Sequence, residues 1–333
     1  MWYDYAGKDS DVVISTRIRL ARNLADKPFP GRLSPEGAEE IIEKTKNALS
    51  GEKLDFINVS AAEPLYNTIL MEDHLVSSEL IQKRLPCGVF VGENLSVMVN
   101  EEDHLRIQCI LSGYDLDDAY EKISSLDSTL ESKLNFAFSE KYGYLTKCPT
   151  NAGTGMRASV MLHLPALTIS GNINTIINAV SKLGVTVRGM YGENSNANAC
   201  IYQVSNQLTL GISEEETLKK LGDVVDMIVE KERHILKTLL DNGPVAFKDK
   251  VFRAFGILQN AYSMSTEEFM THIPYVKLGI GAGLFENLTA EEINKLIITI
   301  QPAHVTKSAG DDNIRKRDEV RASLLREFFK EKR

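Results

Sequence analysis

The sequence lacks the features that would place it in several common protein classes. Its cysteines are widely spaced and form no C-x-x-C pair, so a structural zinc site is not expected. No apolar run is long enough to cross a membrane, and the first residues lack the basic and apolar stretches of a signal peptide. We therefore expect a cytoplasmic protein with reduced thiols. The four cysteines are Cys87, Cys109, Cys148 and Cys200.

Positive charge is also in short supply. The chain has 38 Lys and Arg against 46 Asp and Glu, a net charge of −8, which does not favour direct binding to nucleic acid or to an anionic membrane. The phosphate-binding motif G-x-x-x-x-G-K-[ST] and the kinase motif H-R-D are both missing. If this chain handles phosphate, other groups must hold it.

The pattern of apolar residues predicts a mixed first part and a helical second part. Alternation predicts strands at 11–20, 104–111, 159–164 and 201–204 and a hairpin at 87–99, while helical spacing predicts helices from Ser34 and across 116–138. After Gly211, capping boxes begin at Ser213 and Thr289, and strand signals become scarce. We expect an α+β fold with an α+β body at 1–240 and a helical part at 241–333.

Arginines occur where forked donors suit a polyphosphate. They lie at the ends of predicted strands or in glycine-rich turns, and a guanidinium can bind phosphate through two parallel hydrogen bonds. For any single one, a solvated surface charge is the simpler interpretation. The five candidates are Arg17, Arg19, Arg106, Arg157 and Arg188.

Carboxylates are crowded between two predicted strands. The segment Asn100-Glu101-Glu102-Asp103-His104 could bind Mg²⁺, accept a proton or hold a guanidinium, although an ordinary acidic turn has the same composition. A further carboxylate, Glu193, follows Arg188 in a glycine-rich loop.

Taken together and in order, five blocks resemble the catalytic domain of the phosphagen (guanidino) kinase family. They span roughly residues 10–210, and five matching blocks are far more specific than any one of them. The blocks are Ser15–Arg19, Asn100–Ile107, Cys148–Asn151, Arg157–Val160 and Arg188–Glu193.

This resemblance implies a fold and a set of nucleotide-binding residues. The fold would be a large antiparallel sheet flanked by helices, of the glutamine-synthetase-like kind, followed by a helical C-terminal domain that supports dimers. ATP with Mg²⁺ would be bound by Ser15, Thr16, Arg17, Ile18, Arg19, His74, Arg106, Arg157, Ala158, Ser159, Val160, Met161, Arg188, Gly189, Met190, Tyr191, Gly192 and Glu193.

The resemblance also implies catalytic roles for Glu101, Glu102, Glu193 and Cys148. A guanidinium with a pKa above about 12 is not nucleophilic at neutral pH, so carboxylates must align it and accept a proton. Glu102 is the better candidate for the base and Glu193 for the orienting group, although the two roles could be exchanged. A Cys148 thiolate would help to orient the guanidinium without forming a covalent intermediate.

Within the family, the chain resembles the bacterial protein arginine kinases of the McsB type. The sequences of residues 15–24 and 157–164 are close to those of that branch. The family pattern also begins so early in the chain that we expect no small N-terminal helical domain. The segment 317–322 reads R-D-x-x-R-A, which implies allosteric phosphoarginine binding, whereas a solvated basic helix is the plainer alternative. The implied phosphoarginine ligands are Arg317, Asp318, Arg321 and Ala322.

The resemblance implies protein substrates with exposed arginine, among them a stress-response repressor and damaged proteins bound for a Clp protease. It also implies a small zinc-containing activator protein and a homodimer. Two other functions remain open: a phosphagen kinase acting on a free small guanidine such as arginine, and a non-catalytic adaptor that binds phosphoarginine.

Overall fold

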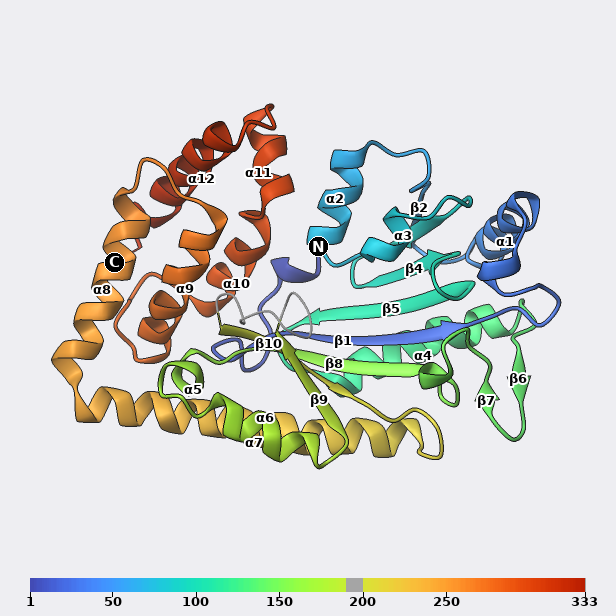
Figure 1. The fold of residues 1–333 in the computed structure, drawn as a ribbon, viewed down its shortest axis with the longest axis horizontal. Helices are drawn as coiled ribbons and strands as arrows, with labels where there is room; N and C mark the ends of the chain where they lie inside the picture. Colours follow the sequence, from blue (N-terminus) through green and yellow to red (C-terminus); the bar gives the residue numbers. More distant parts are fainter. Residues whose placement is uncertain (190–199, 333) are drawn as a thin grey trace.

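A computed structural model describes residues 1–189 and 200–332. In this part of the chain, strands form an eight-stranded sheet in the order β2-β3-β4-β5-β1-β8-β10-β9, and each neighbouring pair is antiparallel (Figure 1). The expected large antiparallel sheet is confirmed. Its strands are β1 Val13–Arg22, β2 Asp55–Ile57, β3 Gly88–Val91, β4 Leu95–Val99, β5 Leu105–Ser112, β8 Met156–His163, β9 Val185–Gly189 and β10 Ile201–Asn206.

Helices surround this sheet and form the whole C-terminal part of the described chain (Figure 1). Ser34, Ser213 and Thr289 cap their helices as their sequences predict, each accepting a hydrogen bond from a backbone amide of the first turn. The helices are α1 Pro35–Ala48, α2 Pro64–Glu72, α3 Ser78–Ile81, α4 Leu116–Glu131, α5 Pro165–Ile169, α6 Ile173–Ser181, α7 Glu214–Asn242, α8 Pro244–Asn260, α9 Thr266–Gly281, α10 Ala290–Thr299, α11 Pro302–Ala309 and α12 Ile314–Phe329.

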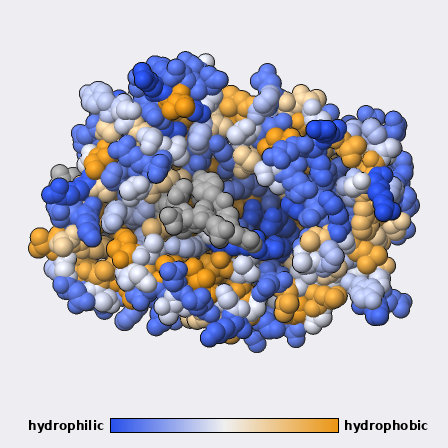
Figure 2. Space-filling view, viewed as in Figure 1, coloured by the Kyte–Doolittle hydropathy of each residue, from blue (hydrophilic) through white to orange (hydrophobic). Residues whose placement is uncertain are grey.

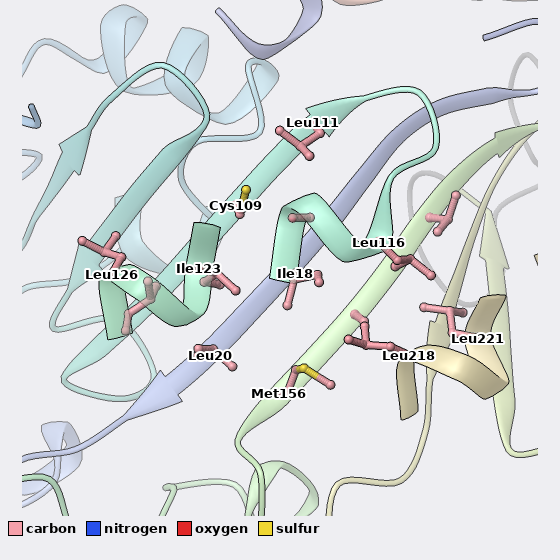
Figure 3. Packing of buried hydrophobic residues seen from close by; sticks show 14 of the residues in the cluster. Ile18, Leu20, Cys109, Leu111, Leu116, Ile123, Leu126, Met156, Leu218 and Leu221 are labelled. Atoms are coloured by element: carbon pink, nitrogen blue, oxygen red, sulfur yellow. The ribbon is translucent and has the colours of Figure 1, made fainter. Parts of the chain in front are cut away.

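One face of the sheet is apolar and is covered by α4 and α7. Alternate residues of the central strands point to this face because side chains in a strand alternate with period two. They pack against leucines and isoleucines that recur on one side of each helix (Figure 3). The side chains in contact include Ile18, Leu20, Cys109 and Met156 from the strands and Ile123, Leu126, Leu218 and Leu221 from the helices.

The opposite face of the sheet is apolar at one end of its strands and carries arginines at the other. At the end where β1 begins, Ile14, Ile110, Met161 and Ile201 belong to the same apolar cluster as the C-terminal helices. Toward the other end, this face carries Arg19 of β1, Arg106 of β5 and Arg157 of β8. The C-terminal helices therefore cover one end of the face, and the arginines lie at the other.

One predicted helix boundary differs from the structure. The helix predicted for 116–138 ends at Glu131, because the chain then runs extended, with Ala137 donating a backbone hydrogen bond to Asn23 and Phe138 pairing with Tyr144 in a two-stranded ribbon. The division near residue 240 stays a prediction, and α7 is a single helix up to Asn242. Among the described residues, no helix has the length and apolarity needed to span a membrane.

Candidate active site

The arginines come together because the strand register places them on one face. Arg19 of β1 lies opposite Arg157 of β8, and Ala21 of β1 lies opposite Arg106 of β5. Arg17 precedes Arg19 by two residues and so points to the same side. Arg188 of β9 lies opposite Gln203 of β10, which pairs with Met161 of β8 on that face.

A polar cavity of about 290 Å³ opens over these strands. Figure 2 shows a hydrophilic hollow near the middle of the molecule, over the central strands as seen in Figure 1. Six of the residues predicted for the site line this cavity, namely Arg19, Glu102, Cys148, Arg106, Arg157 and Arg188. Four separate strands and two loops thus converge on one cavity.

Two of the guanidinium groups, those of Arg17 and Arg19, are poorly neutralised. Among the described residues, neither Arg17 nor Arg19 has an ion-pair partner, and the buried Arg19 Nε has no hydrogen-bond acceptor. Burial, followed by the charges of Arg106 and Arg157, lowers the pKa of Arg17 to about 10. Burial and neighbouring arginines also lower the pKa of Arg157. A cluster of buried cations is costly without anions, so a ligand with several negative charges would stabilise it.

A rigid turn presents the carboxylates. Asn100 adopts a left-handed φ of 63° and its amide donates to the backbone oxygen of Pro86 at 2.9 Å. The amide of His104 donates to Asn23 Oδ1 at 2.9 Å. The His104 ring accepts from the Leu24 amide at Nδ1 (3.0 Å), so its Nε2 donates to the Pro28 oxygen at 2.9 Å. Glu101 and Glu102 are therefore fixed in space between β4 and β5.

The two glutamates of this turn differ. Glu101 is fully buried and does not line the cavity; its carboxylate accepts from Arg106 Nη1 at 2.6 Å and from the Ser77 hydroxyl. Glu102 faces the cavity, and its carboxylate lies 3.5 Å from Arg106 Nη2. Burial and then the charge of Asp103 raise the pKa of Glu102. Glu102 is thus the more available carboxylate and the better proton acceptor.

Cys148 reaches the cavity from the loop before β8. Its Sγ lies 3.0 Å from Thr150 Oγ1. The Thr209 hydroxyl restrains this loop, because it donates hydrogen bonds to the backbone oxygens of Thr150 and Ala152. Gly153 has a φ of 106°, and a Cβ there would lie 2.1 Å from the Thr209 oxygen, so this position requires glycine.

His74 lies just after α2, on the same side of the sheet as Arg17. It has a left-handed φ of 60°, a conformation that costs a residue with a Cβ roughly 1 kcal/mol. Its ring is buried, Nε2 has no hydrogen-bond partner, and burial together with Arg17 lowers its pKa to about 4. The His74 oxygen accepts from Gln108 Nε2 at 2.9 Å. His74 does not line the 290 Å³ cavity.

Several residues predicted for the site point elsewhere. Thr16, Ile18, Ala158 and Val160 lie on the opposite face, where the Thr16 hydroxyl donates to the Gly113 oxygen at 2.8 Å and the other three join the apolar core. Consecutive residues of a strand point to opposite faces of the sheet, so the residues of one matching block cannot all face one ligand. On the arginine side, Ser15 is buried, and the Ser159 hydroxyl donates a hydrogen bond to the Arg17 backbone oxygen. Met161 packs in the apolar cluster of the C-terminal helices, and Gly189 is the last residue of β9. Met190, Tyr191, Gly192 and Glu193 lie outside the described residues.

The cavity also contains residues that the sequence did not single out. Gln203 and Ser205 of β10 face it, and Ser205 accepts a hydrogen bond from Arg157 at 3.2 Å. Because Gln203 and Ser205 alternate with Tyr202 and Val204 in the sequence, they can be predicted to share one face of β10. The sequence does not show that β10 pairs with β8, which is what brings this face to the cavity. The remaining lining residues are Ala21, Thr150, Asn151 and Gly155.

The predicted phosphoarginine segment lies on α12. Arg321 is only 2% exposed, and its guanidinium donates to the oxygens of Met264 (2.9 Å) and Ile300 (3.2 Å) and to Asp318 (2.7 Å). Ala322 is in the apolar core, while Arg317 is half-buried. The two arginines of the motif therefore have different surroundings.

Comparisons with known proteins agree with this arrangement. Residues 37–235 match the family described as ATP:guanido phosphotransferase, C-terminal catalytic domain, and residues 244–333 match the family described as Protein-arginine kinase McsB C-terminal domain. A lombricine kinase crystal structure superposes with a TM-score of 0.61 at 24% identity, covering 71% of this chain and 69% of that one. A duplicated taurocyamine kinase from Schistosoma mansoni gives 0.61 at 26% identity, over 73% of this chain and 36% of that one.

Full-length relatives are more similar. The chain is 42% identical to the protein-arginine kinase of Halothermothrix orenii over 331 residues, which cover 98% of this chain and 95% of the relative. It is also 42% identical to the protein-arginine kinase of Brevibacillus brevis, over 98% of this chain and 94% of the relative. The chain therefore belongs to the ATP:guanido phosphotransferase family, as a member of its protein-arginine kinase branch.

Proposed function

We propose that this chain transfers the γ-phosphoryl group of ATP to arginine side chains of other proteins. The observation that carries the proposal is one cavity in which guanidinium groups from four strands lie with a carboxylate and a thiol, and in which Arg19 has no ion-pair partner among the described residues. The anionic phosphates of ATP suit the guanidinium groups, and a cationic guanidinium acceptor suits the carboxylate and the thiol. Membership of the protein-arginine kinase branch supports a protein-borne acceptor.

The arginines would stabilise the transferring group. Negative charge spreads over the equatorial oxygens of a phosphoryl group in flight, and fixed donors in a sheltered cavity stabilise that charge strongly. Arg19, Arg106 and Arg157 are held by neighbouring central strands, so they need little rearrangement when ATP binds.

Glu102 would act on the acceptor. As a guanidinium nitrogen attacks the γ-phosphorus, its N–H proton passes to the Glu102 carboxylate, the N–P bond forms, and the bond to the bridging oxygen breaks so that ADP leaves with the electron pair. The raised pKa of Glu102 suits it to hold that proton. Cys148, on the same cavity, would orient the guanidinium, and Glu193 stays a prediction for a second orienting carboxylate.

Mg²⁺ would be bound chiefly through the phosphates of ATP. The described residues contain no group of three side chains suited to bind a metal, and Glu102 is the only carboxylate among those that line the cavity. This composition fits Mg²⁺, which usually binds proteins through one or two carboxylates together with substrate phosphates. The bound ion would neutralise charge on the β- and γ-oxygens.

Further roles rest on membership of this branch. They are a cytoplasmic location, a homodimer, a small zinc-containing activator, and a part in stress regulation and Clp proteolysis. We also retain the phosphoarginine site as a proposal, in which the half-buried Arg317 meets the ligand and the buried Arg321 fixes the helix.

The decisive test is direct detection of the product. The full chain, Mg-ATP and a folded protein acceptor are incubated, and mass spectrometry under non-acidic conditions locates acid-labile phosphate on arginine. Glu102→Gln should lower kcat by at least about 100-fold and leave ATP binding within about twofold, because the amide cannot accept the proton. Lys237→Ala on α7, exposed and remote, is the control.

The same assay separates the two other functions. Efficient phosphorylation of free arginine with none on proteins would establish a phosphagen kinase instead. Binding of phosphoarginine with no turnover by the parent, and no difference in the Glu102→Gln variant, would establish an adaptor.

A further inference from the structure

The end of α2 is attached to the C-terminal helices. The Glu72 carboxylate accepts from the backbone amides of Ala303 (2.8 Å) and His304 (3.1 Å), which are the first free donors of α11. A carboxylate at this position satisfies orphan donors and complements the positive end of the helix dipole. Glu72 therefore ties the end of α2 to the start of α11.

The next residue makes a second attachment. Asp73 is buried, and its Oδ1 lies 2.9 Å from His304 Nε2 and accepts from the Tyr3 hydroxyl at 2.9 Å. Its backbone oxygen accepts from Trp2 Nε1 at 2.8 Å. The contact with Asp73 raises the pKa of His304, so the histidine donates in a charge-assisted hydrogen bond. Asp73 is thus held by α11 and by the start of the chain.

His74 directly follows Glu72 and Asp73, and its ring is near enough to Arg17 for that charge to lower the pKa of His74. Its φ of 60° is unfavourable for a side chain with a Cβ, and such a conformation persists only when the surroundings fix it. Glu72 and Asp73 supply that restraint on one side. On the other, Gln108 donates to the His74 oxygen and lies opposite Arg19 in the sheet register.

We propose that His304 of α11 is a positioning residue for the ATP site, acting through Asp73 on His74 beside Arg17. The proposal rests on the proposed function and on the ATP-binding role that the family resemblance implies for His74, which lies near Arg17 and outside the residues that line the 290 Å³ cavity. His304 lies in the C-terminal match at 244–333 and outside the catalytic match at 37–235. The C-terminal helices thereby help to set the affinity for ATP, in addition to covering the sheet.

The test compares two substitutions at one position in the full chain. His304→Ala removes the donor to Asp73, whereas His304→Gln can place an amide N–H near the position of the imidazole Nε2. His304→Ala should raise KM for ATP about tenfold with KM for the protein acceptor within about twofold, and His304→Gln should recover to within about threefold of the parent. Equilibrium ATP binding should show the same order. Lys237→Ala is again the control.

A purely stabilising role would give a different result. It would lower the melting temperature of His304→Ala and leave KM for ATP unchanged in the folded fraction, and that outcome would overturn the proposal. So would equal changes in the KM values of both substrates. If His304→Ala does not fold, Glu72→Gln provides the second variant, since it weakens the cap on α11; its KM for ATP should rise severalfold, and an unchanged value would also overturn the proposal.

Failure of the proposed function can be recognised separately. A parent chain that binds ATP but phosphorylates no protein arginine would contradict the assigned activity. Equilibrium ATP binding by the two His304 variants would still decide whether α11 positions the site.

Discussion

At the scale of single residues, His74 is the clearest conflict between local preference and structure. Helices commonly end with glycine in the left-handed conformation, and here a histidine occupies that position with a buried ring nitrogen that lacks a partner. Backbone strain of this kind is typical of functional sites.

Substitutions at His74 should separate strain from function. Asparagine tolerates a positive φ far better than valine, so His74→Val should lower the free energy of unfolding by about 1–2 kcal/mol more than His74→Asn. Both should raise KM for ATP severalfold, because each removes the ring beside Arg17. Urea unfolding and steady-state kinetics measure the two effects, and equal stabilities would show that the backbone is not strained.

The residue scale also shows what alternation reveals and what it hides. The pattern of Leu105, Arg106, Ile107 and Gln108 predicts two faces, and the structure confirms it. The same rule, applied within the block Ser15–Arg19, would have excluded Thr16 and Ile18 from the cavity. Glu101 could not be excluded this way, because its burial depends on Ser77 and Arg106 from other elements.

At the scale of secondary-structure elements, buried polar side chains join helices that are distant in sequence. Glu232 of α7 caps α5 through the amides of Ala166 (2.7 Å) and Leu167 (2.9 Å). Lys277 of α9 is also buried and donates to Asn294 Oδ1 of α10 at 2.6 Å. Helix positions alone predict neither contact, since each depends on tertiary packing.

Lys277 should make stability depend on pH. Burial lowers its pKa to about 7, against the opposing charges of Asp11, Glu291 and Glu232. Between about pH 7 and 10.5 the unfolded chain retains a proton that the folded chain has released, so stability rises with pH across this window. The free energy of unfolding of the parent relative to Lys277→Met should increase by on the order of 2 kcal/mol from pH 7 to pH 9. Urea unfolding measures this difference, and an equal difference between parent and variant at the two pH values would contradict the prediction.

At the scale of the whole molecule, the sequence predicted the individual helices and strands better than the way in which they pack together. Capping boxes and apolar periodicity predicted the helical C-terminal part and most central strands. The strand order was not encoded in any local pattern, because β1 lies between β5 and β8, which come from much later in the chain. Only the resemblance to a known family supplied the antiparallel sheet in advance.

The C-terminal helices should be required for the catalytic body to fold well. Ile14, Ile110, Met161 and Ile201 on the sheet, together with Trp2, are buried in one cluster with α8 to α12. A fragment of residues 1–242 would expose this apolar surface, and burying each such side chain contributes about 1.5–3 kcal/mol. We expect the fragment to aggregate or to bind a hydrophobic dye strongly, whereas the full chain should do neither. Light scattering and dye fluorescence measure this, and a monomeric fragment with a cooperative unfolding transition would show that the first 242 residues form an independent domain.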